Sequence, residues 1–344
     1  MTDGVDPVPG LDVEQLRAYL DRERPGLVRG PLQASVIPGG RSNLSYDVGA
    51  GASEWVLRRP PLGHVLATAH DMAREYRVIT ALAGVIPVPR MVLLCEDESV
   101  LGAPFYLMER VEGTVYRTAA QTAALSAEEK RALACSLIDV LADLHAVDPA
   151  AVGLADFGRP QGFLERQVRR WARQLEQSRS REVAGIDRLR KILASSVPAS
   201  SEAALVHGDY RLDNVLADDV QRIVAVLDWE MATLGDPRTD LGLFLLYWDG
   251  LGAMDNPVLG GVGAAAGFPA GVELVRRYEG RRGVDVGPLD WYLAFACFKL
   301  AVIAEGIWFR FTRGQTVGGG FEAFGDLVEP LVRRGLDVME RPDP

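Results

Sequence analysis

The stretch that decides the fold is residues 207–214, His-Gly-Asp-Tyr-Arg-Leu-Asp-Asn, which is followed further along the chain by Asp228. A short apolar run precedes each of these polar segments, at 203–206 and at 223–227. Short apolar runs that are bounded by polar residues predict buried strands. The sequence therefore places two sets of polar side chains at the ends of two buried strands.

The spacing within this region makes the signal specific. In protein kinases a His-x-Asp catalytic loop has an Asn five residues after the Asp, and a metal-binding Asp follows on the next hairpin. Here Asp209 lies two residues after His207, Asn214 lies five after Asp209, and Asp228 opens an Asp-Trp-Glu sequence. Phosphoryl transfer needs a carboxylate for the acceptor hydroxyl and oxygen ligands for magnesium. The pattern predicts Asp209 as the catalytic carboxylate, with Asn214 and Asp228 as the ligands of Mg²⁺.

The motif His-Gly-Asp-x-x-x-x-Asn, followed by an Asp on the next strand, resembles the aminoglycoside phosphotransferase (APH)-like kinase family. The sequences at 57–61, 74–76 and 101–105 look closest to the phosphotransferases associated with acyl-CoA dehydrogenases. The resemblance covers residues 31 to about 310. It implies an α+β, bilobal, protein-kinase-like fold with ATP or GTP as the phosphoryl donor.

Two domains are expected. Residues 1–111 are predicted to form an N-terminal helix and a small nucleotide-binding lobe built on an antiparallel sheet. Residues 112–344 are predicted to form a larger, mostly helical lobe that carries the catalytic loop and the acceptor site. The small lobe should contain strands at 32–37, 44–48, 54–59, 91–95 and 104–108, with a helix at 68–83.

A glycine-containing turn, Pro-Gly-Gly-Arg-Ser-Asn at 38–43, joins the first two predicted strands. The backbone N–H groups of such a turn can cover phosphates, although a plain hairpin turn explains the pattern equally well. The resemblance implies that this loop covers the nucleotide, with Gly40, Ser42 and Asn43 as binding residues.

A kinase also needs a cation on the third strand to hold the nucleotide phosphates and an acid on the next helix to orient it. Arg58 and Glu75 fit these roles, although most kinases carry Lys at the strand position. Strand alternation favours Arg58 over Arg59, because Val56 and Arg58 share one face. The alternative for Glu75 is an ordinary surface ion pair on the helix.

The segment after the last predicted strand of the small lobe contains a glycine and is expected to link the two lobes. By resemblance, the backbone groups of Glu109 and Val111 would bind adenine there. No long segment after Asp228 resembles a protein-kinase activation loop, which favours a small-molecule acceptor over a protein.

Two further polar residues belong to the predicted helical lobe. The resemblance implies that Asp240 supports the catalytic loop, and an N-cap for the helix from 241 onward is nearly as plausible. His145 ends the predicted helix that starts at 126, where an imidazole can cap carbonyl groups. His145 is therefore interpreted as structural.

Composition restricts the class of protein. The 344 residues, 48% of them apolar, are enough for two lobes, and the net charge of −10 argues against nucleic-acid binding. The first ten residues lack the pattern of a signal peptide, and the apolar segment 291–304 contains Lys299 and is expected to be too short to span a bilayer. A cytoplasmic protein with no membrane partner is predicted.

The segment 291–313 is expected to line the acceptor pocket. It carries three cations, Lys299, Arg310 and Arg313, among several aromatic residues, although much of that aromatic content would equally suit a core. A polycationic aminoglycoside needs a pocket rich in carboxylates. The composition therefore favours an anionic or acyl-bearing acceptor, such as a hydroxyacyl thioester.

Three other functions stay open at this point. The chain resembles enzymes that phosphorylate aminoglycosides or other antibiotics. It is also compatible with a catalytically weak nucleotide-binding module, because Arg58 replaces the usual Lys. A metal-dependent phosphoesterase would instead use His207, Asp209, Asp213 and Asp228 as metal ligands.

Overall fold

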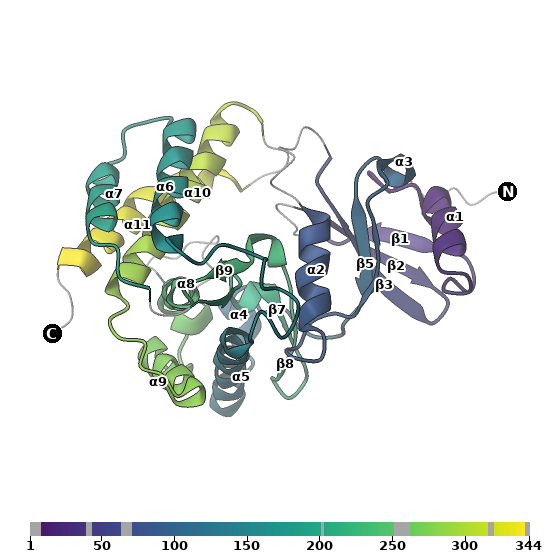
Figure 1. The fold of residues 1–344 in the computed structure, drawn as a ribbon, viewed down its shortest axis with the longest axis horizontal. Coiled ribbons are helices and arrows are strands. Elements are labelled where there is room, and N and C mark those ends of the chain that lie inside the picture. The colour runs from purple at the N-terminus through teal and green to yellow at the C-terminus, as the bar shows by residue number, and fades with distance from the viewer. Residues whose placement is uncertain are drawn as a thin grey trace. The chain divides into compact units, whose positions relative to one another are not determined.

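The computed structural model is shown in Figure 1. It describes residues 8–38, 43–62, 71–200, 203–250, 262–315 and 320–340. The chain divides into two compact units. The first unit is Met1–Glu112 with Ala225–Glu230, and the second is Gly113–Val224 with Met231–Pro344. Asp228 therefore belongs to the first unit, whereas Asp209 and Asn214 belong to the second.

The first unit is built on a five-stranded antiparallel sheet with the strand order β1-β2-β3-β5-β4. The strands are β1 (Gln33–Val36), β2 (Leu44–Ala50), β3 (Ser53–Arg59), β4 (Met91–Cys95) and β5 (Phe105–Glu109). In the described part of this unit, three helices accompany them: α1 (Val13–Glu23), α2 (Met72–Leu82) and α3 (Glu98–Leu101). This sheet, followed by a largely helical C-terminal part, confirms the predicted α+β fold class.

Helices α1 and α2 cover opposite faces of this sheet (Figure 1). On the face toward α1, Trp55 and Leu57 of β3 are buried in one apolar cluster with Leu16 and Leu20 of α1. Side chains alternate between the faces of a strand, so Arg58 lies on the other face. Arg58 is consequently directed to the side of the sheet that α2 covers.

The second unit is mainly helical. Its helices are α4 (Ala119–Thr122), α5 (Ala127–Ala146), α6 (Phe163–Ser178), α7 (Ile186–Ser195), α8 (Arg238–Asp249), α9 (Gly271–Arg282), α10 (Asp290–Thr312) and α11 (Glu322–Glu340). Two short two-stranded sheets interrupt them. One pairs β6 (Ala204–Val206) with β9 (Thr233–Gly235), and the other pairs β7 (Val215–Ala217) with β8 (Ile223–Val226). The last two residues of β8, Ala225 and Val226, are already counted with the first unit.

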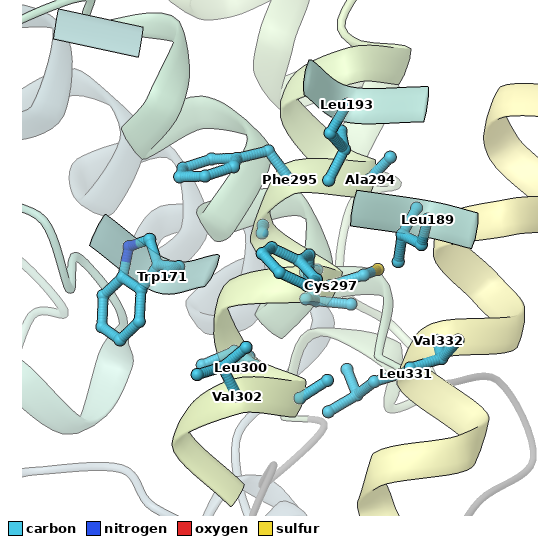
Figure 2. Packing of buried hydrophobic residues seen from close by; sticks show 14 of the residues in the cluster. Trp171, Leu189, Leu193, Ala294, Phe295, Cys297, Leu300, Val302, Leu331 and Val332 are labelled. Carbon is cyan, nitrogen blue, oxygen red and sulfur yellow. The ribbon is translucent and has the colours of Figure 1, made fainter. Parts of the chain in front are cut away.

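Helix α10 forms the centre of the core of the second unit. Its apolar side chains pack against α7 and α11: Figure 2 shows Cys297 next to Leu189 of α7, and Leu331 and Val332 of α11 in the same cluster. At 23 residues α10 is long and apolar enough to cross a membrane, so the expectation of a shorter segment is wrong. However, 72% of its most apolar window is buried inside the protein, as in the core helix of a globular unit.

Candidate active site

Residues 207–214, which we call the catalytic loop after the role predicted for them, begin directly after the buried strand β6 and end in a 3₁₀ turn at Leu212–Asn214. Gly208 has a φ of 85°. A Cβ at this position would lie 2.8 Å from the Cβ of Met231 and 2.9 Å from its carbonyl oxygen. Both the left-handed backbone and the close approach of Met231 therefore require a glycine here.

The carboxylate of Asp240 fixes the first two residues of this loop by accepting hydrogen bonds from their backbone. Its Oδ2 accepts a 2.7 Å hydrogen bond from the backbone N–H of His207, and its Oδ1 accepts one of 2.8 Å from that of Gly208. Asp240 lies in the first turn of α8, which begins at Arg238. The interpretation as a loop support is therefore right, and the N-cap alternative is wrong.

His145 is a second support beneath the loop. Its Nε2 lies 3.2 Å from Oδ2 of Asp240, and its Nδ1 lies 2.8 Å from the hydroxyl of Tyr278. His145 is structural, as expected, but it does not cap helix carbonyls with its ring. The imidazole instead connects α9 to the carboxylate that organises the catalytic loop.

These contacts keep Asp240 ionised. Burial is the largest influence and disfavours the charged form, but the hydrogen bond from His145 and those from the loop outweigh it, so the pKa of Asp240 is lowered. A buried ionised carboxylate with three donors around it is a rigid anchor. The backbone of His207 and Gly208 is therefore fixed immediately before Asp209.

The carboxylate of Asp209 is held by groups on both of its oxygens. Oδ2 accepts a 2.9 Å hydrogen bond from Nδ2 of Asn214 and lies 3.5 Å from Nε of Arg211. Oδ1 accepts a 3.3 Å hydrogen bond from the hydroxyl of Tyr247, whose ring also lies beneath the Arg211 guanidinium. The side chain keeps 25% of its surface exposed. The carboxylate is therefore oriented and still accessible to a hydroxyl group.

Asn214 has the chemistry expected of a magnesium ligand. Its Nδ2 donates to both the carbonyl oxygen and Oδ2 of Asp209, at 2.8 and 2.9 Å. Within the part of the chain that the structure describes, its side-chain oxygen makes no hydrogen bond. Oxygen ligands are the ones that Mg²⁺ prefers, so this amide oxygen fits the metal.

In the first unit, Arg58 joins three acids into what we call the Arg58 cluster: Arg58, Glu75, Asp228 and Glu230. Its Nε lies 3.5 Å from Oε2 of Glu75, and a terminal nitrogen pairs with Asp228 and lies 3.9 Å from Oε2 of Glu230. The side chain of Arg58 is 11% exposed and that of Glu75 is 1% exposed. The cluster is thus a mostly buried ion-pair network with a surplus of acids.

Glu75 is a core residue of this cluster, and its interpretation as a surface ion pair is wrong. Burial raises the pKa of Glu75, while Arg58 and a hydrogen bond with Tyr106 oppose that rise. Oε1 of Glu75 also accepts a 3.2 Å hydrogen bond from the backbone N–H of Trp229. Glu75 therefore fixes both the cation on β3 and the backbone that follows Asp228.

Asp228 adopts a backbone conformation that few side chains tolerate. Its φ is 65°, in the left-handed region, where Asp and Asn occur more often than other non-glycine residues. Such a conformation costs on the order of 1 kcal/mol and persists where its surroundings hold it. Here the next residue does so, because Trp229 donates from its backbone to Glu75 and from Nε1 to the carbonyl of Val226.

Arg59 lies on the other face of β3, away from the Arg58 cluster. Its side chain is 4% exposed and donates to the carbonyls of Gly10 and, at 2.9 Å, Leu101. The register expected from alternation is therefore the observed one. Arg58, not Arg59, is grouped with Glu75 and Asp228.

The remaining predicted nucleotide-binding residues differ in what the structure says of them. Asn43 is 4% exposed, and its Nδ2 donates to Oε2 of Glu230 at 3.0 Å. Gly40 and Ser42 lie outside the described residues. Glu109 is the last residue of β5, and its N–H donates to the carbonyl of Arg90 at 2.9 Å. Val111 follows the end of that strand.

The segment expected to line the acceptor pocket is only partly available for that role. Trp291, Phe295 and Phe298 are buried in the core of the second unit, so the core alternative is right for these aromatic residues. Arg313 is exposed and stacks on Phe309. Lys299 alone of the three predicted cations reaches the catalytic loop, where Nζ donates to the carbonyl of Gly208 at 2.6 Å.

His207 supports the loop from within. Its side chain is buried, and Nδ1 accepts a 3.2 Å hydrogen bond from the backbone N–H of Asp209. Asp213, another ligand in the phosphoesterase interpretation, pairs with Arg211 at 3.5 Å. Across the described ranges, no three His, Cys, Asp or Glu side chains gather into a metal-binding group.

Sequence reasoning missed several members of these two sites. Tyr247 and Tyr106 belong to no motif, Glu230 enters only as the last residue of Asp-Trp-Glu without a role, and Lys299 enters only through its charge. Each contacts a residue far away in the sequence, as Glu230 does with Asn43. Local patterns contain no signal for such contacts.

An antiparallel five-stranded sheet, a mainly helical second part and a His-x-Asp loop with its Asn define a kinase-like phosphotransferase fold. The model of the phosphotransferase enzyme family (APH) matches residues 33–276, and the chain belongs to that family. It is 35% identical to acyl-CoA dehydrogenase family member 11 of Rattus norvegicus over 345 residues, which cover 97% of this chain and 44% of that protein. The chain thus spans less than half the length of the curated relatives it matches.

Solved structures agree with this assignment. A Ralstonia eutropha JMP134 protein, provisionally described as an aminoglycoside phosphotransferase, superposes with a TM-score of 0.81 at 33% identity, covering 96% of this chain and 98% of that one. The GDP complex of aminoglycoside 2'-phosphotransferase-IIIa superposes with a TM-score of 0.63 at 16% identity, covering 95% and 99% of the two chains. The second match shows a shared fold with a protein that binds a guanine nucleotide.

Proposed function

We propose that this protein transfers the γ-phosphoryl group of ATP or GTP to a hydroxyl group of a small molecule. The observation that supports this most strongly is the Asp209 carboxylate, which Asn214 and Tyr247 orient and which remains a quarter exposed. A carboxylate of this kind is suited to orient or deprotonate an attacking hydroxyl.

In the proposed reaction, the acceptor oxygen attacks the γ-phosphorus and forms a new P–O bond. The bond between that phosphorus and the bridging oxygen of the nucleotide breaks, and the nucleoside diphosphate leaves. The hydroxyl proton passes to the carboxylate of Asp209. Support for the loop by Asp240 keeps this carboxylate in place while charge develops on the transferred group.

Arg58 would hold the nucleotide phosphates, with Glu75 as the acid that orients it. Arg58 carries positive charge in any accessible pH range, because the surrounding acids raise its pKa although burial opposes them. Asn43, Glu109 and Val111 are proposed to contact the nucleotide, together with Gly40 and Ser42.

Magnesium would bind to oxygen atoms of Asn214 and Asp228. The amide oxygen of Asn214 and the carboxylate of Asp228 match the oxygen ligands that this ion prefers. When bound, the ion would neutralise charge on the phosphates. The strained backbone of Asp228 is consistent with a functional position.

We further propose an anionic or acyl-bearing acceptor, such as a hydroxyacyl thioester, rather than an aminoglycoside. The support is the position of Lys299, a nearly buried cation that is bonded to the carbonyl directly before Asp209. A cation at this position would repel a polycationic acceptor.

A coupled assay of nucleoside diphosphate release tests the proposal. Purified protein with Mg²⁺ and ATP or GTP is offered hydroxyacyl-CoAs, kanamycin-type aminoglycosides, choline-like alcohols and sugars. Hydroxyacyl-CoAs should stimulate release and become phosphorylated, whereas aminoglycosides should do neither. Efficient phosphorylation of kanamycin would overturn the proposed acceptor class, and no acceptor-dependent transfer to any compound would count against a kinase.

A further inference from the structure

Two cations of the second unit lie against the same indole ring. Arg170 and Trp171 are neighbours on α6, and Lys299 comes from α10. The guanidinium carbon of Arg170 lies 5.4 Å from the centre of the Trp171 ring, and Nζ of Lys299 lies 5.7 Å from it. We call Arg170, Trp171 and Lys299 the Trp171 cluster.

The ammonium group of Lys299 has unused donor capacity. It carries three N–H donors. Among the residues that the structure describes, its one hydrogen bond goes to the carbonyl of Gly208, at 2.6 Å. Lys299 is 7% exposed, so water has little access to the group as a whole. Further acceptors are needed to satisfy a cation that is buried to this extent.

Neither cation has an acidic partner within the described ranges. No carboxylate there lies within ion-pair distance of Arg170 or Lys299. Burial, the largest influence, lowers the pKa of Lys299, Arg170 lowers it further, and Asp209 and Asp240 act in the opposite direction. A nearly buried and unpaired ammonium group beside a second cation is costly unless a negative charge joins them.

Trp171 adds a third unfilled donor. Its side chain is 4% exposed, and in the described part of the chain its buried Nε1–H has no hydrogen-bond partner. Buried indole N–H groups usually find a partner. All three members of the cluster therefore have donor capacity that the described chain does not use.

The cluster is placed beside the reacting group. Lys299 bonds the carbonyl of Gly208, the residue directly before Asp209. Arg170, by contrast, is exposed at the surface of α6 and open to a ligand from solution. The cluster thus extends from an accessible arginine to the backbone that carries the catalytic carboxylate.

We propose that the Trp171 cluster is a subsite for an anionic oxygen group of the acceptor, a carboxylate or a phosphate. This inference rests on the proposed function, in which the acceptor presents its hydroxyl to Asp209. An anion bound by Arg170 and Lys299 anchors the acceptor at one end, while its hydroxyl reaches the catalytic carboxylate. The subsite selects acceptors that combine a negative charge with a hydroxyl.

Calorimetric titration of the full chain tests the subsite. The protein is first saturated with Mg²⁺ and a non-hydrolysable ATP analogue, so that the probes cannot occupy the nucleotide site. The probes are 3-hydroxybutyrate, 3-hydroxybutyryl-CoA and the uncharged 1,3-butanediol. At least one anionic probe should bind more tightly than the diol, with an affinity that falls as salt rises. Tight binding of 3-hydroxybutyrate would show that the subsite accepts a carboxylate. Tight binding of 3-hydroxybutyryl-CoA without binding of the free acid would show that it accepts a phosphate.

Substitutions of the exposed Arg170 provide the main test, because they leave the buried core unchanged. Arg170→Gln should weaken binding of the anionic probe by roughly tenfold or more, the scale of one charge-assisted hydrogen bond. Arg170→Lys should retain most of the affinity. Arg169→Gln, which removes a neighbouring exposed arginine of α6, should leave it unchanged. Lys299→Met should weaken binding in the same way as Arg170→Gln.

Two results would overturn the subsite. One is wild-type protein that binds neither anionic probe more tightly than the diol. The other is an equal effect of Arg169→Gln and Arg170→Gln. Anion binding that depends on Arg170, in a protein that transfers no phosphoryl group, would reject the proposed function and keep the subsite. Phosphoryl transfer together with anion binding that Arg170→Gln leaves unchanged would reject the subsite and keep the proposed function.

Discussion

Replacing Asp240 by Asn should destabilise the protein by removing the charge that organises the catalytic loop. The wild-type carboxylate accepts from two backbone N–H groups, at 2.7 and 2.8 Å, on different oxygens. An amide has one oxygen, so its NH₂ group must face one of these two donors. A buried donor that loses a charged acceptor costs about 1.5–3 kcal/mol, and disruption of a buried charged network costs about 3–5 kcal/mol. We expect a loss of about 2–4 kcal/mol in the free energy of unfolding.

Urea unfolding of the wild type and the variant measures this loss, with Asp143→Asn as the control. Asp143 makes two 2.7 Å contacts with Arg281, but its side chain is 42% exposed, so its loss should cost at most about 1 kcal/mol. Equal losses for the two variants would refute the argument that burial gives Asp240 its effect.

The effect of Asp240→Asn should also depend on pH. The folded protein lowers the pKa of Asp240 below its ordinary value of 3.8. The stability that its charge contributes is therefore present above that ordinary value and is lost as the pH falls through the folded-state pKa. The difference between the wild type and Asp240→Asn should consequently shrink in acid. A difference that stays constant down to unfolding would contradict the assignment of the charge.

Two further predictions concern Arg58 and Gly208. Arg58→Ala should lose about 3 kcal/mol or more of transition-state stabilisation, measured as kcat/KM for the nucleotide, whereas Arg58→Lys should keep substantial activity. Arg59→Ala should lower stability instead, and a larger kinetic effect of Arg59→Ala than of Arg58→Ala would contradict the assigned roles. Gly208→Ala should cost more stability than Gly153→Ala, because both glycines have positive φ but only Gly208 meets another residue, Met231, within 3 Å of an added Cβ. Equal midpoints of urea unfolding for the two alanine variants would refute this reasoning.

Local sequence patterns were sufficient for the positions of individual residues on their elements. Strand alternation assigned Arg58 and Arg59 to opposite faces of β3, because one residue's difference in register changes the face. The spacing from Asp209 to Asn214 likewise predicted that both residues belong to one loop, and the structure brings their side chains together there. Both inferences depend on short separations, for which backbone geometry is nearly fixed.

Contacts between distant segments were beyond such patterns. His145 lies at the end of a helix, where an imidazole commonly caps carbonyl groups. Its ring is instead hydrogen-bonded to the buried carboxylate of Asp240, 95 positions away. Lys299 lies inside helix α10, and its ammonium group donates to the carbonyl of Gly208, 91 positions away. In both cases tertiary packing determines the partner, and the hydrophobic periodicity of a sequence contains no information about such contacts.

The role of Asp209 is the central claim, and one comparison tests it most directly. Phosphoryl transfer and nucleotide affinity are measured for the wild type, Asp209→Asn and Asp213→Asn, with the acceptor that the wild type uses best. Asp209→Asn should lower the transfer rate about 10²–10⁴-fold, the usual range for loss of a general base, and leave nucleotide affinity nearly unchanged. Asp213→Asn, in the same loop, should keep most of the activity. Transfer by Asp209→Asn at a rate close to that of the wild type would contradict the account.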